Sequence, residues 1–254
     1  MNRQLTTSEL LGSTAVLAGL LALWWLTSHA GWISKVFLPT PEATLSSLRE
    51  GLTDGELLSF TGATVGRMLA GWGLAIVAGI GLGALIGSSV TARNWIGPTL
   101  EFVRPLPASA VMPLAIAIFG LSGGMVLTVV AFGAMWPVLL ATVHGLAGVH
   151  PSLREVAASL QIGRGEFLWK IGLPNALPDI VAGMRLAMTI SLIVSVVGEM
   201  IASQPGLGQA ILLAARAFRA SELFAGIVLL GAIGFASNAL LALAERRLLH
   251  WQNT

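Results

Sequence analysis

Long apolar runs, separated by short polar segments, dominate the pattern along this chain. A helix needs about 20 mostly apolar residues to cross the hydrocarbon core of a bilayer. The runs predict about six membrane spans, at residues 10–26, 68–87, 102–120, 125–147, 180–202 and 223–244. The third span contains Pro105, Pro107 and Pro113, which a bundle tolerates where neighbouring helices satisfy the freed carbonyls. The pattern therefore predicts an all-α integral membrane protein in which residues 1–254 form one membrane domain.

The second predicted span carries a small residue at every fourth position. These residues are Ala75, Gly79, Gly83 and Gly87. Such a row lies on one face of a helix and lets a second helix backbone approach closely. We interpret it as a packing surface inside the helix bundle.

Composition supports the membrane assignment and narrows the range of functions. The chain is 55% hydrophobic and 10% charged, with a mean hydropathy of +0.83 and no cysteine. Disulfides, thiolate metal sites and a cysteine nucleophile are therefore excluded. The net charge of +2 comes from basic residues scattered among apolar runs, so nucleic-acid binding is not expected. The four histidines show no paired metal-ligand spacing, and no metal site is predicted.

The basic residues predict the orientation of the spans, because cytoplasmic loops carry an excess of lysine and arginine. With the N-terminus inside, the basic residues on or near the cytoplasmic side are Arg3, Arg93, Arg104, Arg154, Arg164, Lys170, Arg185, Arg246 and Arg247. Those on or near the outer side are the minority Lys35, Arg49, Arg67, Arg216 and Arg219. Both termini and the polar insert at residues 150–178 are then cytoplasmic.

The first run has a second interpretation as a cleaved signal peptide. The tripeptide Ser28-His29-Ala30 resembles a small-x-small cleavage site. The run is longer than a usual signal-peptide core, however, and Trp24 and Trp25 are typical of an aromatic anchor at a membrane interface. We favour a membrane span, and the orientation of the other spans is the same in either case.

The insert at residues 150–178 is polar although the chain around it is apolar. Pro151 suits the first turn of a helix. The apolar residues that then follow the i, i+3, i+4, i+7 spacing of one helix face are Leu153, Val156, Ala157 and Leu160. The pattern therefore predicts a short amphipathic helix.

A second short helix is expected after a break at Gly163-Arg164-Gly165, with Pro174 and Pro178 ending it before the next span. Periodicity alone leaves two interpretations of this pair of helices open. The first is an interfacial helix on the inner leaflet, attracted by Arg164 and Lys170. The second is a surface presented to a cytoplasmic partner.

The insert sequence EVAASLQIGRGEFLWKIGLP resembles the cytoplasmic signature loop of permease subunits of bacterial ATP-binding-cassette (ABC) importers. That loop reads E-A-A, then a glycine, then L-P some ten residues later. The positions that match in register are Glu155, Ala157, Leu173 and Pro174. Two positions depart from the pattern, because Val156 replaces the middle alanine and Gln161 stands where the family has its usual glycine. Gly163 is expected to supply the break instead.

Further stretches resemble the nitrate, taurine and alkanesulfonate branch of these permeases, and they cover nearly the whole chain from Phe37. They are FLPTPEATL, GRMLAGW, EFVRPLPASAVMPLAIAIFG, PDIVAGMRLAM, GEMIASQPGLGQAI and ERRLLHW. The resemblance implies the fold of a type I ABC importer permease with a cytoplasmic coupling helix, in the bacterial inner membrane. The favoured cargo is a small anion such as a sulfonate, taurine or nitrate, and bicarbonate or a heterocyclic vitamin precursor is the alternative.

The resemblance also implies partners: a second copy of the chain, two cytoplasmic ABC ATPase subunits and a periplasmic binding protein that delivers substrate. The chain itself is then a transport subunit without an ATPase site, since its sequence lacks the G-x-x-x-x-G-K-[ST] phosphate loop. No cofactor is expected in this chain, and ATP and Mg²⁺ belong to the partner ATPase. The residues implied to couple to the ATPase are Arg154, Glu155, Val156, Ala157, Ala158, Leu160, Gln161, Gly163, Leu173 and Pro174.

Charged residues and prolines within the spans are the candidates for the transport pathway or its gates, because intramembrane ionisable residues are functional candidates by default. They are Arg67, Arg104, Pro105, Pro107, Pro113, Arg185 and Glu199, and Met200 beside Glu199 is added to them. Arg67 and Arg185 either favour passage of an anion or extend to a membrane interface. For Glu199 the favoured alternative is structural, a pairing with an arginine or with loop amides near residues 206–208.

Two other functional classes compete with an importer subunit. An intramembrane serine protease is suggested by Gly120-Leu121-Ser122-Gly123 and His144, but Ser122 and His144 lie roughly 30 Å apart along one helical run. A catalytic pair needs hydrogen-bond reach, about 3 Å, so this pairing fails. A stand-alone secondary transporter or channel has no need of the coupling-type insert. An internal repeat of the spans favours that class, and none is evident.

Overall fold

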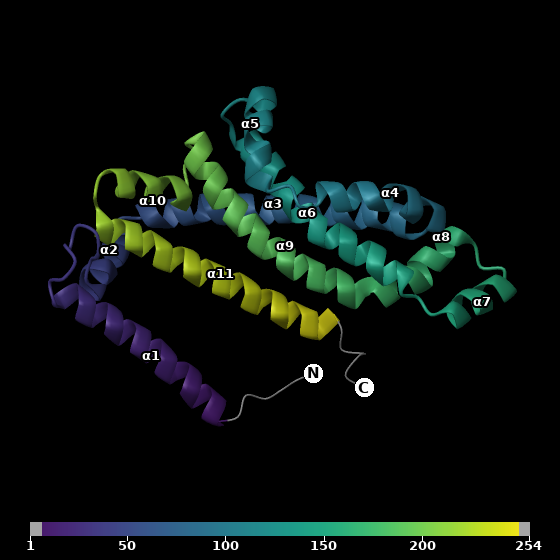
Figure 1. Ribbon diagram of the computed structural model, residues 1–254, viewed down its shortest axis with the longest axis horizontal. Coiled ribbons are helices and arrows are strands. Elements are labelled where there is room, and N and C mark those ends of the chain that lie inside the picture. Colours follow the sequence, from purple (N-terminus) through teal and green to yellow (C-terminus); the bar gives the residue numbers. More distant parts are fainter. Residues whose placement is uncertain (1–6, 249–254) are drawn as a thin grey trace. The chain divides into compact units, whose positions relative to one another are not determined.

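The computed structural model describes residues 7–248, and every regular element in that range is helical (Figure 1). The elements are α1 (Thr7–His29), α2 (Pro41–Thr53), α3 (Glu56–Gly87), α4 (Val90–Val103), α5 (Ala108–Phe119), α6 (Gly123–Ala147), α7 (Pro151–Ser159), α8 (Arg164–Phe167), the π-helical turn η1 (Leu168–Gly172), α9 (Leu173–Ala202), α10 (Leu207–Arg216) and α11 (Ala220–Leu248). The expectation for both chain ends, including Arg3, falls outside the described residues.

Among residues 7–248, five helical segments are long and apolar enough to cross a membrane. They are Leu11–His29, Glu56–Gly87, Gly123–Ala147, Arg164–Ala202 and Ala220–Leu248. The pair α4 and α5 passes the same test together, which gives up to six spans. The predicted all-α fold with about six spans is therefore confirmed.

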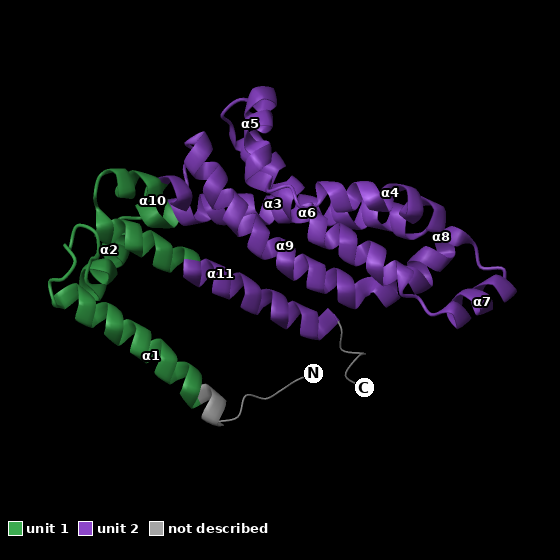
Figure 2. Cartoon of the chain, in the orientation of Figure 1, with its two compact units in different colours: residues 1–59, 210–230 green, residues 60–209, 231–254 purple. Residues whose placement is uncertain are grey.

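The chain divides into two compact units (Figure 2). Unit 1 comprises residues 1–59 and 210–230, and unit 2 comprises residues 60–209 and 231–254. Aromatic side chains hold unit 1 together: the rings of Trp24 and Phe224 stack at 5.8 Å, and the Trp24 indole N–H donates to the Pro39 carbonyl at 3.0 Å. All the candidate functional residues lie in unit 2.

The predicted row of small residues on α3 packs against α6 inside unit 2. Of the predicted residues, Gly79, Gly83 and Gly87 lie against Val138, Thr142 and Leu146, in that order, and Ala75 is buried. Gly71 extends the row by one step and lies against Val130. Both sets recur mostly at four-residue intervals, so each glycine receives one side chain of the facing ridge. A Cβ atom at residue 79 would lie 2.8 Å from the Val138 Cβ, which leaves no room for a larger residue. The packing interpretation is confirmed.

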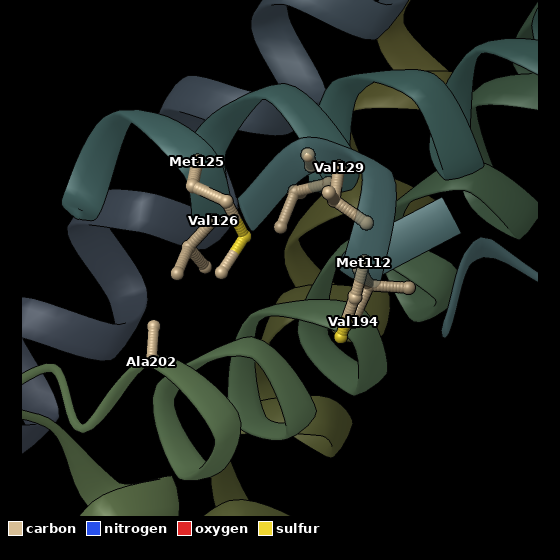
Figure 3. Packing of buried hydrophobic residues seen from close by; sticks show 8 residues of the cluster. Met112, Met125, Val126, Val129, Val194 and Ala202 are labelled. Carbon is tan, nitrogen blue, oxygen red and sulfur yellow. The ribbon is translucent and has the colours of Figure 1, made fainter. Parts of the chain in front are cut away.

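Helix α9 packs along α6 through small residues of its own. Gly198 lies against Val126, and Gly183 lies against the Pro137 carbonyl. Near the other end of the pair, Gly145 of α6 lies against Ala176. Figure 3 shows the apolar core that joins these helices to α5, in which Met112 meets the α6 and α9 side chains. Helices α3, α6 and α9 therefore form a tightly packed group.

A sharp break separates α4 from α5. The two helices bend by 91° between Val103 and Ala108, a stretch that contains Pro105 and Pro107. Proline removes the backbone donor and fixes φ, and the residue before it avoids the helical region, so two closely spaced prolines end a helix. The segment expected as one span at residues 102–120 is thus the end of α4, this break and α5.

The second half of the polar insert differs from its expectation. Pro174 and Pro178 were expected to end a short helix, but both lie within α9, which follows α8 and η1 without a break. Pro174 occupies the first turn of α9, and the amide of Leu173 bonds to the Leu168 carbonyl five residues earlier. The wider π-helical turn therefore accommodates a proline that would otherwise interrupt the helix.

Candidate functional site: a cytoplasmic insert and a cleft

Helix α7 carries the amphipathic pattern of the insert, and Figure 1 shows it beyond the ends of α6 and α9. Its amino end is capped by His150, whose Nδ1 accepts from the Ser152 amide at 3.3 Å. Ala157 is buried, whereas the other three residues of the predicted apolar face are exposed: Leu153 at 44%, Val156 at 54% and Leu160 at 68%. Glu155 and Ala158 are exposed beside them. Helix α7 thus presents an apolar face with one acidic residue at its edge.

Arg154 fixes α7 to the end of α6. Its guanidinium donates to the carbonyls of Leu146 and Ala147, at 3.0 and 3.3 Å. These carbonyls belong to the last turn of α6, where backbone acceptors lack helical partners and a cation is favoured. Asn175, at the start of α9, donates to the neighbouring Gly145 carbonyl at 3.3 Å. The carboxyl end of α6 is therefore tied to α7 on one side and α9 on the other.

The turn after α7 is made at Gln161. This residue has a φ of 55°, in the left-handed region that favours glycine. The Gln161 amide bonds to the Ala158 carbonyl at 3.0 Å, and the Ile162 amide bonds to the Ala157 carbonyl at 2.9 Å. This pair of hydrogen bonds is the Schellman pattern, which usually has glycine at the left-handed position.

Gly163 does not supply the break that was expected of it. Its φ of −63° and ψ of 153° are extended values open to any residue. The left-handed turn stands instead at Gln161, the position where the resemblance places a glycine. The backbone at residue 161 therefore has the left-handed conformation that a glycine favours, as the resemblance implies, although the residue itself is glutamine.

A cleft of about 1150 Å³ lies between α5, α6 and α9. Its walls are mostly apolar, and the polar or charged residues among them are Arg104, Ser109, His144, Asp179 and Thr189. Of the eight pathway candidates only Arg104 lines this cleft. Asp179 and His144 were visible in the sequence as an acid at the end of the insert and a histidine in an apolar run. Their shared position depends on the pairing of α6 with α9, which no local pattern reveals.

The remaining pathway candidates lie outside the cleft walls. Pro105 and Pro107 form the break after α4, and Pro113 is exposed on α5. Arg185 forms an ion pair with Glu245 of α11. Met200 is half-buried in α9.

Glu199 is fully buried and is held by three hydrogen-bond donors. Arg67 forms an ion pair with one carboxylate oxygen. The other oxygen accepts from the Thr64 hydroxyl at 3.0 Å and from the Gly208 amide at 2.9 Å. The pairing expected of Glu199, with an arginine and with an amide near residues 206–208, is present. We call Thr64, Arg67, Glu199, Leu207 and Gly208 the Glu199 cluster.

The rest of the Glu199 cluster binds the loop that follows α9. The Leu207 amide donates to the Thr64 hydroxyl at 2.9 Å, and Arg67 also donates to the Pro205 carbonyl. Gly206 lies directly against the Glu199 carboxylate, where any Cβ atom would collide with it. The cluster therefore joins α3, α9 and the first residues of α10, and it requires a glycine at position 206.

The residues that suggested a protease have separate structural places. Ser122 caps the amino end of α6, where its hydroxyl accepts from the Met125 amide at 3.1 Å. His144 lies in the last turn of the same helix. A helix of this length separates them by roughly 30 Å, so they form no catalytic pair within the chain.

Comparison with known proteins places this arrangement among membrane transport subunits. The family described as "Binding-protein-dependent transport system inner membrane component" matches residues 75–250. A Bacillus subtilis (strain 168) protein named as an aliphatic sulfonates transport permease is 32% identical, over 93% of this chain and 86% of that protein. The Escherichia coli (strain K12) taurine transport system permease protein is 30% identical, over 99% of this chain and 91% of that protein.

Two further similarities concern a nitrate permease and a solved structure. The nitrate import permease protein of Leptolyngbya laminosa is 30% identical, over 77% of this chain and 70% of that protein. A crystal structure of an amino acid ABC transporter with histidines superposes with a TM-score of 0.62 at 20% identity. The superposition covers 79% of this chain and 97% of the other, which shows a shared fold.

Proposed function

This chain belongs to the family of binding-protein-dependent transport system inner membrane components, and on that premise we propose that it is the permease subunit of an ATP-driven importer. Its family and its apolar helices make it a multi-pass inner-membrane permease of the ABC type. Such a subunit works with an ATPase and a substrate-binding protein and is not itself an enzyme. We propose that both chain ends and α7 face the cytoplasm, as the positive-inside bias predicts.

The observation that carries this proposal is the exposed apolar face of α7 on a rigidly anchored insert. Exposed apolar side chains that share one helix face mark a contact with a protein or a membrane, and the family match, together with the likeness of this insert to the coupling loop, favours a protein. Arg154 holds that surface to the end of α6, and α8 connects it to α9. We propose that two ATPase subunits, which bind ATP and Mg²⁺, contact α7 of two copies of this chain. Movement of the ATPase pair then moves α6 and α9 through the insert.

A homodimer would cover the cleft walls that are exposed in the single chain. Several of its wall residues are exposed in the single chain, among them Leu186 at 62% and Ile193 at 57%. In a bilayer, a wall with Arg104 and Asp179 calls for a protein surface or water opposite it, because charged groups face a bundle interior or a cavity. We propose that a second copy supplies that surface and that the two clefts form one alternating-access pathway.

The proposed cargo is a small anion of the sulfonate, taurine or nitrate type. The names of the relatives in Bacillus subtilis, Escherichia coli and Leptolyngbya laminosa support this class. Arg104 supports it independently, because arginine keeps its charge and binds sulfonate-like oxyanions through a planar set of donors. The mostly apolar wall suits the hydrocarbon part of an organic sulfonate.

The test is uptake by proteoliposomes that contain this chain with its candidate ATPase, supplied with binding protein and ATP. We expect accumulation of labelled taurine, an alkanesulfonate or nitrate that requires ATP, the ATPase and the binding protein. Each component is omitted in turn as the control. Accumulation that continues without the ATPase contradicts the proposal and indicates a stand-alone transporter or channel.

A further inference from the structure

One uninterrupted helical segment connects the insert to the Glu199 cluster. It runs from Arg164 to Ala202, through α8, η1 and α9, and comprises 39 residues. At 1.5 Å per residue its length is about 58 Å, enough to cross a bilayer and extend beyond it on one side. One end of this segment adjoins α7, and the other end carries Glu199 three residues before the helix stops. Displacement of either end is therefore carried to the other by a single helix.

The Glu199 cluster fixes the far end of that segment to two other elements. Thr64 and Arg67 belong to α3, while the Leu207 and Gly208 amides open α10. The loop between α9 and α10 includes the exposed residues Ser203 and Pro205, and Arg67 bonds to the Pro205 carbonyl. The exposed loop is thus linked to a fully buried carboxylate through Arg67, which bonds to both, and the Gly208 amide that follows the loop donates to the same carboxylate. The loop is also bonded to α9 through its backbone, because the Gln204 amide donates to the Glu199 carbonyl at 3.1 Å.

We propose that Glu199 is a positioning residue for transport coupling. When the loaded binding protein contacts loop 203–206, the Glu199 cluster makes α9 and its attached insert move. The inference rests on the proposed function, which places this loop on the outer side of the membrane. Glu199 neither touches the cargo nor lines the cleft. It keeps α3, α9 and the start of α10 moving as one body, so that the outer contact changes the ATPase-facing end.

A purely structural cluster and a coupling cluster give different results in the assembled importer. A structural cluster affects folding, so its loss lowers basal and stimulated ATP hydrolysis in the same proportion. A coupling cluster affects the ratio between them, because it transmits the binding-protein signal and leaves the ATPase itself intact. The ratio of stimulated to basal hydrolysis is therefore the decisive quantity.

The test uses the full complex in nanodiscs with loaded binding protein. Glu199→Gln keeps the size and the acceptor oxygen but removes the charge that pairs with Arg67. Thr64→Val removes the hydroxyl that joins the Leu207 amide to Glu199 and leaves the ion pair in place. The control is Arg185→Gln, which removes the ion pair with Glu245 elsewhere on α9. Basal and stimulated hydrolysis are measured for each variant.

We expect Glu199→Gln and Thr64→Val to lower the stimulation ratio, by about tenfold for Glu199→Gln, which is a usual size for allosteric coupling. Basal hydrolysis stays within about twofold of wild type, and Arg185→Gln keeps the full ratio. If Glu199→Gln fails to assemble, Thr64→Val decides the question. An unchanged ratio, or a proportional fall of both rates, overturns the inference. A wild type that shows no stimulation contradicts the proposed function itself and removes the basis of the inference.

Discussion

Gly83 of α3 and Thr142 of α6 lie so close that a Cβ atom at residue 83 would come within 2.6 Å of the Thr142 Cβ. It would also lie 2.9 Å from the Leu139 carbonyl oxygen, which is backbone and moves only with α6. We expect Gly83→Ala to lower the free energy of unfolding by about 1 to 3 kcal/mol, because overpacking forces the helices apart. Gly81→Ala is the matched control, since space is open there. Equal unfolding curves in detergent for the two variants would contradict the α3–α6 packing.

Gln161 occupies a backbone conformation that glycine adopts more readily. We expect Gln161→Gly to stabilise the end of α7 by about 0.5 to 1 kcal/mol. Glycine removes the steric cost of the left-handed conformation, and this gain exceeds the loss that comes from a more flexible unfolded chain. Hydrogen exchange at the Gln161 and Ile162 amides should slow correspondingly. Gly163→Ala should leave this exchange unchanged, since residue 163 is extended and has open space. Faster exchange in the glycine variant would show that the Gln161 side chain stabilises the turn.

Arg154 is expected to hold α7 against α6. Arg154→Ala removes two hydrogen bonds from a charged donor, each worth about 1.5 to 3 kcal/mol when well shielded and less for this partly exposed group. Amide exchange throughout α7 should accelerate, while exchange in the core of α6 stays slow. Arg164→Ala, at an exposed arginine of the same insert, serves as the control. Unchanged protection of α7 would mean that other contacts hold it.

Arg104 is expected to act on cargo affinity through its charge in the cleft. Arg104→Gln should raise the KM for anion uptake by about tenfold, equivalent to the loss of about 1.4 kcal/mol of binding. Assembly with the ATPase and basal hydrolysis should be unaffected. The KM of Arg104→Lys should fall between the KM values of wild type and Arg104→Gln, because lysine keeps the charge without the planar set of donors. An unchanged KM in Arg104→Gln would remove this residue from the pathway.

Local sequence patterns predicted the features that depend on periodicity. The spans follow from run length, the α3 packing face follows from the four-residue spacing of Gly79 and Gly83, and α7 follows from its apolar stripe. The type of partner that Glu199 has was predictable, because a buried carboxylate needs hydrogen-bond donors. Amides near residues 206–208 follow it in the sequence, and an arginine lies on another span.

Features that depend on the exact backbone hydrogen bonds or on the packing of distant segments were not predictable from such patterns. Gly163 was the obvious residue for the turn, yet the hydrogen bonds of α7 place the left-handed residue at Gln161. Pro174 and Pro178 suggested a helix end, but the π-helical turn absorbs the mismatch. Asp179 reaches the cleft only because α9 packs along α6.

Glu155 provides the most direct test of the account, because it lies on the exposed surface proposed to contact the ATPase. The measurement is vanadate-sensitive ATP hydrolysis by nanodisc complexes of wild type, Glu155→Lys and the control Glu166→Lys, which alters an acid of the same insert outside α7. Wild type and Glu166→Lys should copurify with the ATPase and respond to loaded binding protein, whereas Glu155→Lys should lose assembly or stimulation. Full stimulation of Glu155→Lys, or a wild-type chain that never associates with an ATPase yet exchanges solute alone, would contradict the account.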